Sequence, residues 1–265
     1  MTEFIQSLQN DKVKNLVRLQ KKPAERKKQG LFVVEGRREV SLALNNNIEP
    51  KSFFICDEIY SPDPFYPLST DAYPGIPTYK VSADVYDKIA YRGDTQGIIM
   101  IAANKNSGLS GFKIGSSGII LVLESIEKPG NLGAVFRTAD ASGIDAIIIC
   151  GQNFDIYNPN VIRSSLGCIF TKQIATCSNE EALAYFRNNN FEILAAHPDG
   201  GQNHTDADYN KSSAIVLGTE SEGLSEFWKQ NADKLITIPM MGQIDSLNIS
   251  VSAAVIAYEA LRQRR

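Results

Sequence analysis

The chain has 265 residues, 43% of them hydrophobic and 22% charged, with a formal net charge of -3 at pH 7. This length allows one large domain or two ordinary ones, and the composition is that of a soluble globular protein. No apolar run approaches the roughly 20 residues needed to cross a bilayer, and the first residues lack the pattern of a signal peptide, so we expect a cytoplasmic protein.

The cysteines and histidines do not predict a metal site. They are four cysteines and two histidines: Cys56, Cys150, Cys168, Cys177, His197 and His204. No CxxC pair occurs, and the histidines are not at metal-ligand spacing from the cysteines. Cys56 and Cys150 end apolar runs, so we expect both to be buried thiols and expect no bound metal.

Positive charge is concentrated near the N-terminus. Residues 12–38 contain ten Lys or Arg against Glu25 and Glu35, a local charge of +8 in a chain that is acidic overall. A charge run is often no more than a solvated helix face. Its concentration here favours a surface that faces a polyanion.

The first 103 residues predict a small α/β domain. In chain order the patterns predict a helix over 4–20, a strand over 31–36, a helix over 38–44, a strand over 52–56, a proline-rich turn region over 61–77, a helix over 82–90 and a strand over 97–103. Residues 104–117 have the composition of a linker.

Residues 118–265 alternate between strand and helix patterns. Strands are predicted at 118–124, 145–150, 191–196, 213–217 and 235–239, with a weaker one at 169–174, and helices at 130–142, 159–166, 179–188, 225–232 and 246–263. The strands are almost continuously apolar, which predicts a parallel sheet covered by helices on both faces. In such a sheet, ligands bind beyond the carboxyl ends of the strands.

The loop after the first of these strands contains Asn131 and Arg137 at the start of a predicted helix. Its glycines do not form the GxGxxG pattern of dinucleotide-binding proteins. Arg137 could be a solvated surface arginine, but small residues surround it, which suits close approach of a ligand.

Two further strand-end loops have the residue types of a binding site. In one, Gly218 and Gly223 flank a polar turn with Glu220, so backbone amides could approach a ligand; Glu220 alone reads as a helix-entry carboxylate. In the other, Met240 and Asn248 could equally be core filling and an ordinary first-turn residue.

Taken together, these three loops resemble the SpoU (TrmH-like) branch of the SPOUT RNA methyltransferases. Motif 1 resembles Asn131-x5-Arg137-Thr138-Ala139, motif 2 resembles Leu217-Gly218-x-Glu220-x2-Gly223-Leu224, and motif 3 resembles Ile238-Pro239-Met240 followed by Ser246-Leu247-Asn248-x-Ser250. The likeness covers 118–265. Residues 1–103 are similar to the RNA substrate-binding domain often attached to this branch, on the cues Gly30-x-Phe32-x2-Glu35-Gly36 and Gln96-Gly97-Ile98.

The resemblance implies an α/β catalytic domain with a deep trefoil knot, a homodimer, and S-adenosyl-L-methionine as methyl donor. Knots are rare in proteins, so element patterns alone would not predict one. The implied cofactor-binding residues come from motifs 2 and 3: Leu217, Gly218, Glu220, Gly223, Ile238, Pro239, Met240, Ser246 and Leu247.

The implied reaction is methylation of a ribose 2′-OH in RNA. The implied catalytic residues are Asn131, Arg137, Glu220 and Asn248. A guanidinium cannot act as an ordinary base, so we expect Arg137 to hold a phosphate and orient the hydroxyl, and the proton acceptor stays open. Asn131 and Asn248 would position substrate or Arg137, and Glu220 would orient Arg137 or the motif 2 loop.

The N-terminal domain would bind structured RNA through phosphate contacts, with Arg37, Arg38 and Arg92 as the best candidates. Ribosomal RNA is the favoured substrate, because the extra domain accompanies large RNA substrates in the family. Transfer RNA and a non-catalytic RNA-binding role on the same scaffold remain as alternatives, although the intact motif residues argue against the last.

Overall fold

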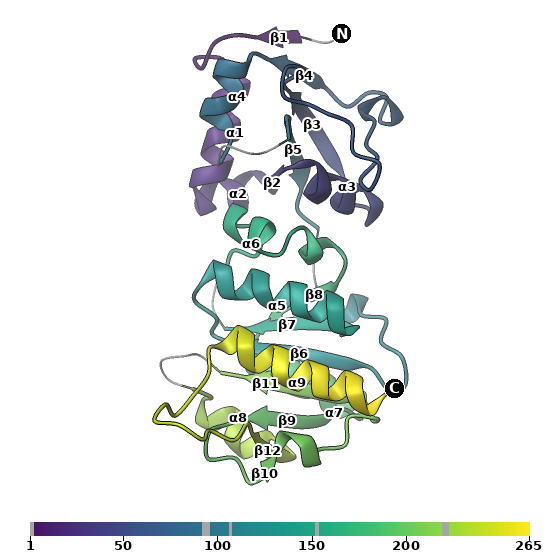
Figure 1. The fold of residues 1–265 in the computed structure, drawn as a ribbon, viewed down its shortest axis with the longest axis vertical. Helices are drawn as coiled ribbons and strands as arrows, with labels where there is room; N and C mark the ends of the chain where they lie inside the picture. The colour runs from purple at the N-terminus through teal and green to yellow at the C-terminus, as the bar shows by residue number, and fades with distance from the viewer. Residues whose placement is uncertain (1–2, 92–95, 106–107, 152–153, 219–222) are drawn as a thin grey trace. The chain divides into compact units, whose positions relative to one another are not determined.

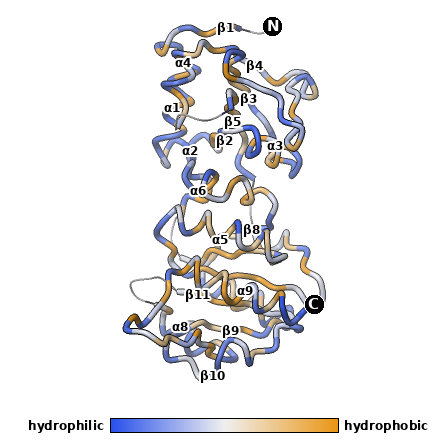
Figure 2. The backbone as a smooth tube through the Cα atoms, viewed as in Figure 1, coloured by the Kyte–Doolittle hydropathy of each residue, from blue (hydrophilic) through white to orange (hydrophobic). Residues whose placement is uncertain are grey.

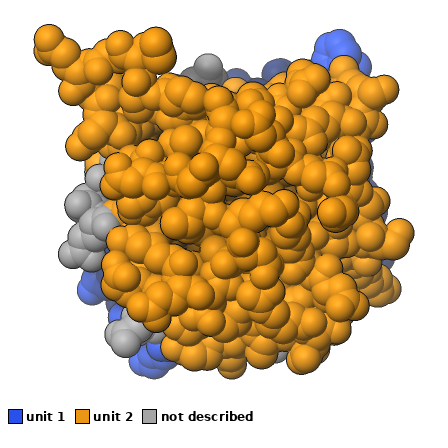
Figure 3. Space-filling view, turned by 90° about the horizontal axis from the view of Figure 1, so that it is seen from below, with its two compact units in different colours: residues 1–105, 155–171 blue, residues 106–154, 172–265 orange. Residues whose placement is uncertain are grey.

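A computed structural model describes residues 3–91, 96–105, 108–151, 154–218 and 223–265. The chain forms two compact units (Figure 3). The N-terminal unit comprises residues 1–105 together with 155–171, and the C-terminal unit comprises 106–154 and 172–265. The predicted α/β class with a parallel sheet and a smaller N-terminal domain is confirmed.

The N-terminal unit contains a five-stranded sheet in the order β1-β4-β3-β5-β2. The strands are β1 (Glu3–Ile5), β2 (Leu31–Glu35), β3 (Pro50–Ile55), β4 (Thr78–Val81) and β5 (Ile98–Ala103). The sheet is mixed, because β5 pairs antiparallel with β2 and β3, whereas β4 pairs parallel with β1 and β3. The sequence did not predict β1 or β4.

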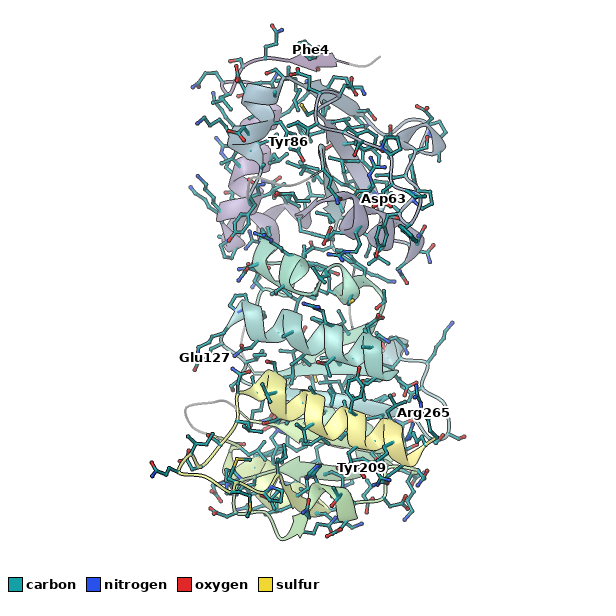
Figure 4. All side chains as sticks on the ribbon, viewed as in Figure 1. Phe4, Asp63, Tyr86, Glu127, Tyr209 and Arg265 are labelled. Atoms are coloured by element: carbon teal, nitrogen blue, oxygen red, sulfur yellow. The ribbon has the colours of Figure 1, made fainter. Side chains whose placement is uncertain are left out.

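The helices of this unit are α1 (Asp11–Lys21), α2 (Pro23–Gln29), α3 (Arg37–Asn45) and α4 (Ala83–Ile89). The predicted helix over 4–20 is wrong in its first half, because the Asn10 side chain accepts the Lys12 N–H and caps a helix that begins only at Asp11. Apolar residues of α1, α4 and the sheet form one core, in which Tyr86 is almost fully buried (Figure 4).

Residues 155–171 group with the N-terminal unit, although they were predicted to lie in the second domain. Within this segment, α6 (Pro159–Ser164) is preceded by Tyr157, whose ring stacks on Phe32 of β2 with centroids 4.0 Å apart. The buried Arg26 of α2 forms an ion pair with Asp155. These contacts explain why the segment packs as part of that unit.

The C-terminal unit contains a seven-stranded sheet in the order β10-β12-β9-β11-β6-β7-β8 (Figure 1). The strands are β6 (Ile119–Glu124), β7 (Ala146–Cys150), β8 (Gln173–Cys177), β9 (Glu192–Ala196), β10 (Gln202–Asn203), β11 (Ser213–Leu217) and β12 (Lys234–Thr237). All neighbouring pairs are parallel, so their carboxyl ends meet at one edge. The central strands form a hydrophobic band in Figure 2.

The helices that cover this sheet are α5 (Pro129–Ser142), α7 (Asn179–Asn188), α8 (Glu226–Asn231) and α9 (Ile249–Gln263). One face of the sheet packs against Phe186 of α7 and Trp228 of α8 in a single buried cluster. Helices α5 and α9 pack against each other and contact β7 and β11 respectively. Side chains alternate between the two faces of a strand, so the other face of the sheet packs against α5 and α9. Helices therefore cover both faces of the sheet, as predicted.

Two predictions for residues 118–265 need adjustment, and one strand was missed. Residues 168–170 form a 3₁₀ turn, so the strand predicted at 169–174 begins only at Gln173. The short β10 was not predicted, and α9 begins at Ile249 rather than at 246. The trefoil knot stays a prediction. Among the described residues, no helix is long and apolar enough to cross a membrane.

Candidate active site

A cavity of about 430 Å³ lies at the carboxyl edge of the parallel sheet. Four segments line it: the end of β9 and the loop after it, the motif 2 residues after β11, the motif 3 residues after β12, and the start of α9. The lining residues are Ala196, His197, Pro198, Asp199, Leu217, Gly218, Gly223, Ile236, Ile238, Met240, Asp245, Ser246, Leu247, Ile249 and Ser252. This is the edge at which parallel sheets bind ligands.

The motif 2 glycines allow a close backbone approach in the cavity wall. A Cβ atom on Gly218 would lie 2.2 Å from the carbonyl carbon of Gly223 and 2.4 Å from the backbone nitrogen of Leu224. Gly223 has a φ of +69°, in the left-handed region that favours glycine. Both glycines are therefore required by backbone geometry, and they leave peptide groups rather than side chains beside the cavity.

Motif 3 positions the start of α9. The Asn248 side chain caps this helix by accepting the backbone N–H of Ser250 at 2.9 Å, and the Ser250 hydroxyl donates to the same oxygen at 2.6 Å. Ser246 and Leu247, directly before the cap, line the cavity. The cap thus fixes the backbone direction between Leu247, which lines the cavity, and the first turn of α9.

Motif 1 meets motif 3 through a side-chain contact. The Nδ2 of Asn248 donates to Oδ1 of Asn131, in the first turn of α5, at 3.4 Å. Arg137 lies on an exposed part of α5, and no ion pair joins it to another described residue. Its guanidinium is available to a charged ligand. Glu127, in the loop before α5, is also marked in Figure 4.

Most of the predicted cofactor-binding residues line this cavity. They are Leu217, Gly218, Gly223, Ile238, Met240, Ser246 and Leu247. Pro239 is not among the lining residues, and Glu220 lies outside the described part of the chain.

Sequence reasoning missed the loop after β9. His197 and Asp199 line the cavity, and the Nδ1 of His197 accepts the backbone N–H of Asp199 at 3.1 Å. The backbone N–H of His197 donates to the carbonyl of Ile236, which ties the end of β9 to β12. The signal was present, because Pro198-Asp199-Gly200-Gly201 is a polar, glycine-containing turn after an apolar strand.

The carboxylates of Asp199 and Asp245 give the cavity hydrogen-bond acceptors. Around them, backbone groups of the strand ends and apolar side chains such as Leu247 and Met240 form the rest of the wall. A ligand with a flat apolar part, hydroxyl donors and a polar tail would match this lining.

The predicted RNA contacts in the N-terminal unit have different environments. Arg37 is only 2% exposed, and its guanidinium lies 4.1 Å from the centre of the Tyr60 ring. This burial does not fit direct contact with an RNA backbone. Arg38 is partly exposed, and its Nη2 lies 3.4 Å from Oε1 of Glu39. Arg92 lies outside the described residues.

Exposed cations lie instead on α1, α2 and the residue between them. Arg18, Lys21, Lys22, Lys27 and Lys28 are exposed, and none forms an ion pair within the described part of the chain. Arg26 is the exception, because it is buried and bonded to the Leu19 and Gln20 carbonyls and to Asp155. The basic stretch is therefore only partly a solvent-facing surface.

The two thiols expected to be buried, Cys56 and Cys150, are confirmed as such. A hydrogen bond with Cys177, together with burial, raises the pKa of the Cys150 thiol. In the described ranges, no group of three or more His, Cys, Asp or Glu side chains is arranged to hold a metal ion.

Comparison with known proteins places the chain in a family. Residues 118–258 match the SpoU rRNA Methylase family, and residues 10–100 match an MRM3-like substrate binding domain. A relative in Bacillus subtilis, 23S rRNA (guanosine(2553)-2'-O)-methyltransferase RlmP, is 26% identical over 96% of this chain and 97% of its own.

Solved structures agree over almost the whole length. An RNA 2'-O ribose methyltransferase is 36% identical with a TM-score of 0.83, covering 98% of this chain and 99% of its own. An AdoMet-bound rRNA methyltransferase from Sinorhizobium meliloti is 26% identical with a TM-score of 0.87, covering 98% of both chains. The three motifs, the cavity they line and these matches show that the chain belongs to the SpoU rRNA methylase family.

Proposed function

We propose that this protein transfers a methyl group from S-adenosylmethionine to a ribose 2′-hydroxyl in ribosomal RNA. The observation that carries the proposal is the cavity at the carboxyl edge of the sheet, with Asn131 and Asn248 joined beside it and Arg137 exposed on the same helix as Asn131. Family membership supports the reaction, and the RNA named for the B. subtilis relative supports the substrate class.

The residues around the cavity fit the cofactor. A volume of about 430 Å³ lies within the range of sites for ligands of this size. The backbone at Gly218 leaves no room for a Cβ, so peptide groups can contact an adenine edge directly. Asp199 and Asp245 would accept hydrogen bonds from ribose hydroxyls or the ammonium group. When bound, the cofactor supplies an electrophilic methyl group on a sulfonium.

The acceptor side of the site is proposed to be motif 1. Arg137 would form charge-assisted hydrogen bonds with a phosphate next to the target nucleotide and so hold the 2′-OH in line. The contact between Asn131 and Asn248 supports this role, because it fixes the start of α5 relative to the start of α9. Glu220 is proposed to orient Arg137 or the motif 2 loop, and the group that accepts the proton stays open.

RNA selection is proposed to reside in the N-terminal unit. The exposed cations of α1 and α2, together with Arg38, would contact phosphates and set the register of the RNA. The match of residues 10–100 to a substrate-binding domain supports this assignment.

A homodimer is proposed from helix α9. Val251 and Tyr258, seven residues apart on the same side of this helix, are 45% and 51% exposed. Large apolar side chains gathered on one side of a helix favour a protein partner, and a second copy of the chain is the partner that the family implies. We also propose a cytoplasmic location, where ribosomal RNA is available.

The test combines binding and mapping. Calorimetry should detect S-adenosylmethionine binding, and no binding at millimolar ligand would leave only the scaffold role. A map of 2′-O-methyl sites in total RNA, with and without the gene, should lose one ribosomal position in the deletion strain. Loss of a transfer RNA position instead would establish the alternative substrate.

A further inference from the structure

Glu124, the last residue of β6, is a buried carboxylate outside the three motifs. It is 5% exposed, and its Oε2 accepts the backbone N–H of Ser225 at 2.9 Å. Its Oε1 accepts two further hydrogen bonds, from the Ser225 hydroxyl at 2.6 Å and from Nδ2 of Asn179 at 2.7 Å. A buried carboxylate is costly without such donors, so all three bonds stabilise this arrangement.

The orientation of the Asn179 side-chain amide, which donates to Glu124, is fixed by its second hydrogen bond. The buried indole Nε1 of Trp228 donates to Oδ1 of Asn179 at 3.0 Å. The amide of Asn179 must therefore point its NH₂ group toward Glu124, because flipping it would set two N–H groups against each other. The position of Glu124 thus requires a group that only accepts hydrogen bonds.

Ser225 links this network to the glycines that line the cavity. It is the N-cap of α8, yet its hydroxyl bonds to Glu124 instead of capping its own helix. Ser225 follows Gly223 by two residues, and the peptide of Gly223 and Leu224 lies directly against Gly218. Gly218 and Gly223 both line the cavity. Holding Ser225 therefore holds the peptide groups of Gly223 and Leu224 against Gly218.

We infer that Glu124, with Asn179 and Trp228, is a positioning unit that fixes the backbone at Gly223 and Leu224 against Gly218 for binding the methyl donor. The inference rests on the proposed function, because it assigns the cavity to S-adenosylmethionine. Glu124 acts through Ser225 and the motif 2 peptides, and it does not need to touch the cofactor. It should therefore govern the affinity for the cofactor and leave the RNA side of the site unchanged.

The test is an exchange of hydrogen-bonding groups. Glu124→Gln preserves shape but sets an NH₂ group against a donor, and we expect the Kd for S-adenosylmethionine to rise about tenfold. The KM for RNA and the kcat at saturating cofactor should stay within about threefold of the native values, which a general loss of folding would not produce. Asn179→Asp alone should also weaken binding, because two carboxylates then face each other.

The double variant E124Q/N179D restores a consistent set of donors and acceptors at unchanged net charge. We expect its Kd to return to within about threefold of the native value. Glu192→Gln is the matched control, since Glu192 is a carboxylate at the amino edge of the same sheet, paired with Lys234; its Kd should not change.

Two outcomes would overturn the inference. One is an E124Q protein with a lower melting temperature but native cofactor affinity, which would make the network purely structural. The other is weakened binding in E124Q that the exchange fails to restore. Absence of cofactor binding in the native protein would instead refute the proposed function, so the two failures are distinguishable.

Discussion

The two sheets of this protein differ in where their strand ends, and so their functional loops, lie. In the C-terminal unit every paired strand is parallel, so the strand ends with their polar loops collect at a single edge, where the cavity lies. In the N-terminal unit β5 runs antiparallel to both of its neighbours, so strand ends are divided between two edges. Single residues can therefore be assigned to a site in the C-terminal unit, while surface charge is the better guide to function in the N-terminal unit.

Replacing a single side chain should have the largest effect on methylation in the C-terminal unit. Arg137→Ala should lower the methylation rate about a hundredfold or more, because a charge-assisted contact in the reacting geometry is lost. Cofactor affinity should stay native, since Arg137 is not part of the cavity wall. Single-turnover methylation and calorimetry measure the two quantities.

Arg187→Ala is the control for that variant. Arg187 is another arginine of the same unit, and its guanidinium lies 2.6 Å from the carboxylate of Asp233. Neither residue lines the cavity. Its methylation rate should remain close to native. Near-normal turnover in Arg137→Ala would refute the assigned role.

The next largest effect should come from the motif 2 backbone. Gly218→Ala places a Cβ 2.2 Å from the Gly223 carbonyl carbon, and strain of about 2 kcal/mol would raise the Kd for S-adenosylmethionine roughly thirtyfold. Gly242→Ala is the control in the motif 3 loop, because a Cβ there meets nothing within 4 Å. Equal affinities in the two variants would show that the close approach at Gly218 has no bearing on the cofactor.

Much of this difference between the units could be predicted from sequence. Apolar strands and strand-end loops gave the parallel sheet, and the motif pattern gave residues such as Gly218 and Leu247 that now line one cavity. The loop at His197 was missed because it carries no recognised motif, although it follows a strand of the same sheet. Glu124 was read only as the end of a strand, since its partners Asn179 and Ser225 lie 55 and 101 residues away.

The N-terminal unit was less predictable. A run of basic residues does not reveal which side chains fold inward, and Arg26 and Arg37 are both buried. The strands β1 and β4 are short, and β4 follows a proline-rich loop, so local pattern was too weak to identify them. The segment 155–171 joined this unit through contacts such as Phe32 with Tyr157, which are distant in sequence.

A smaller effect is expected for the charged surface of this unit. Replacing Lys27 and Lys28 by Ala should weaken RNA binding several-fold and reduce the slope of log K against log salt by about 1 for each lost phosphate contact. Cofactor affinity should not change. Binding titrations at several salt concentrations measure the slope.

The matched control removes the same charge elsewhere in the unit. Lys51 and Lys80 are each paired with a carboxylate, Glu49 and Asp57. Replacing both by Ala should leave the salt slope close to native. An equal loss of slope in the two double variants would mean that net charge, and not the surface of α2, attracts the RNA.

The smallest effect is a pH dependence at the end of α9. Arg262 bonds to the carboxylate of Glu259 and, together with Gln263, lowers the pKa of Glu259 to about 2. A carboxyl with a depressed folded pKa stabilises the protein above its unfolded pKa and loses that contribution as pH falls toward the folded value. Glu259→Gln should therefore lower stability at pH 7 by about 1 kcal/mol, the scale of an ion pair whose arginine is solvent-exposed. The difference in melting temperature between this variant and the native protein should shrink steadily from about pH 5 to pH 2. A difference that is constant over this range would show that the contact at the end of α9 does not depend on the charge of Glu259.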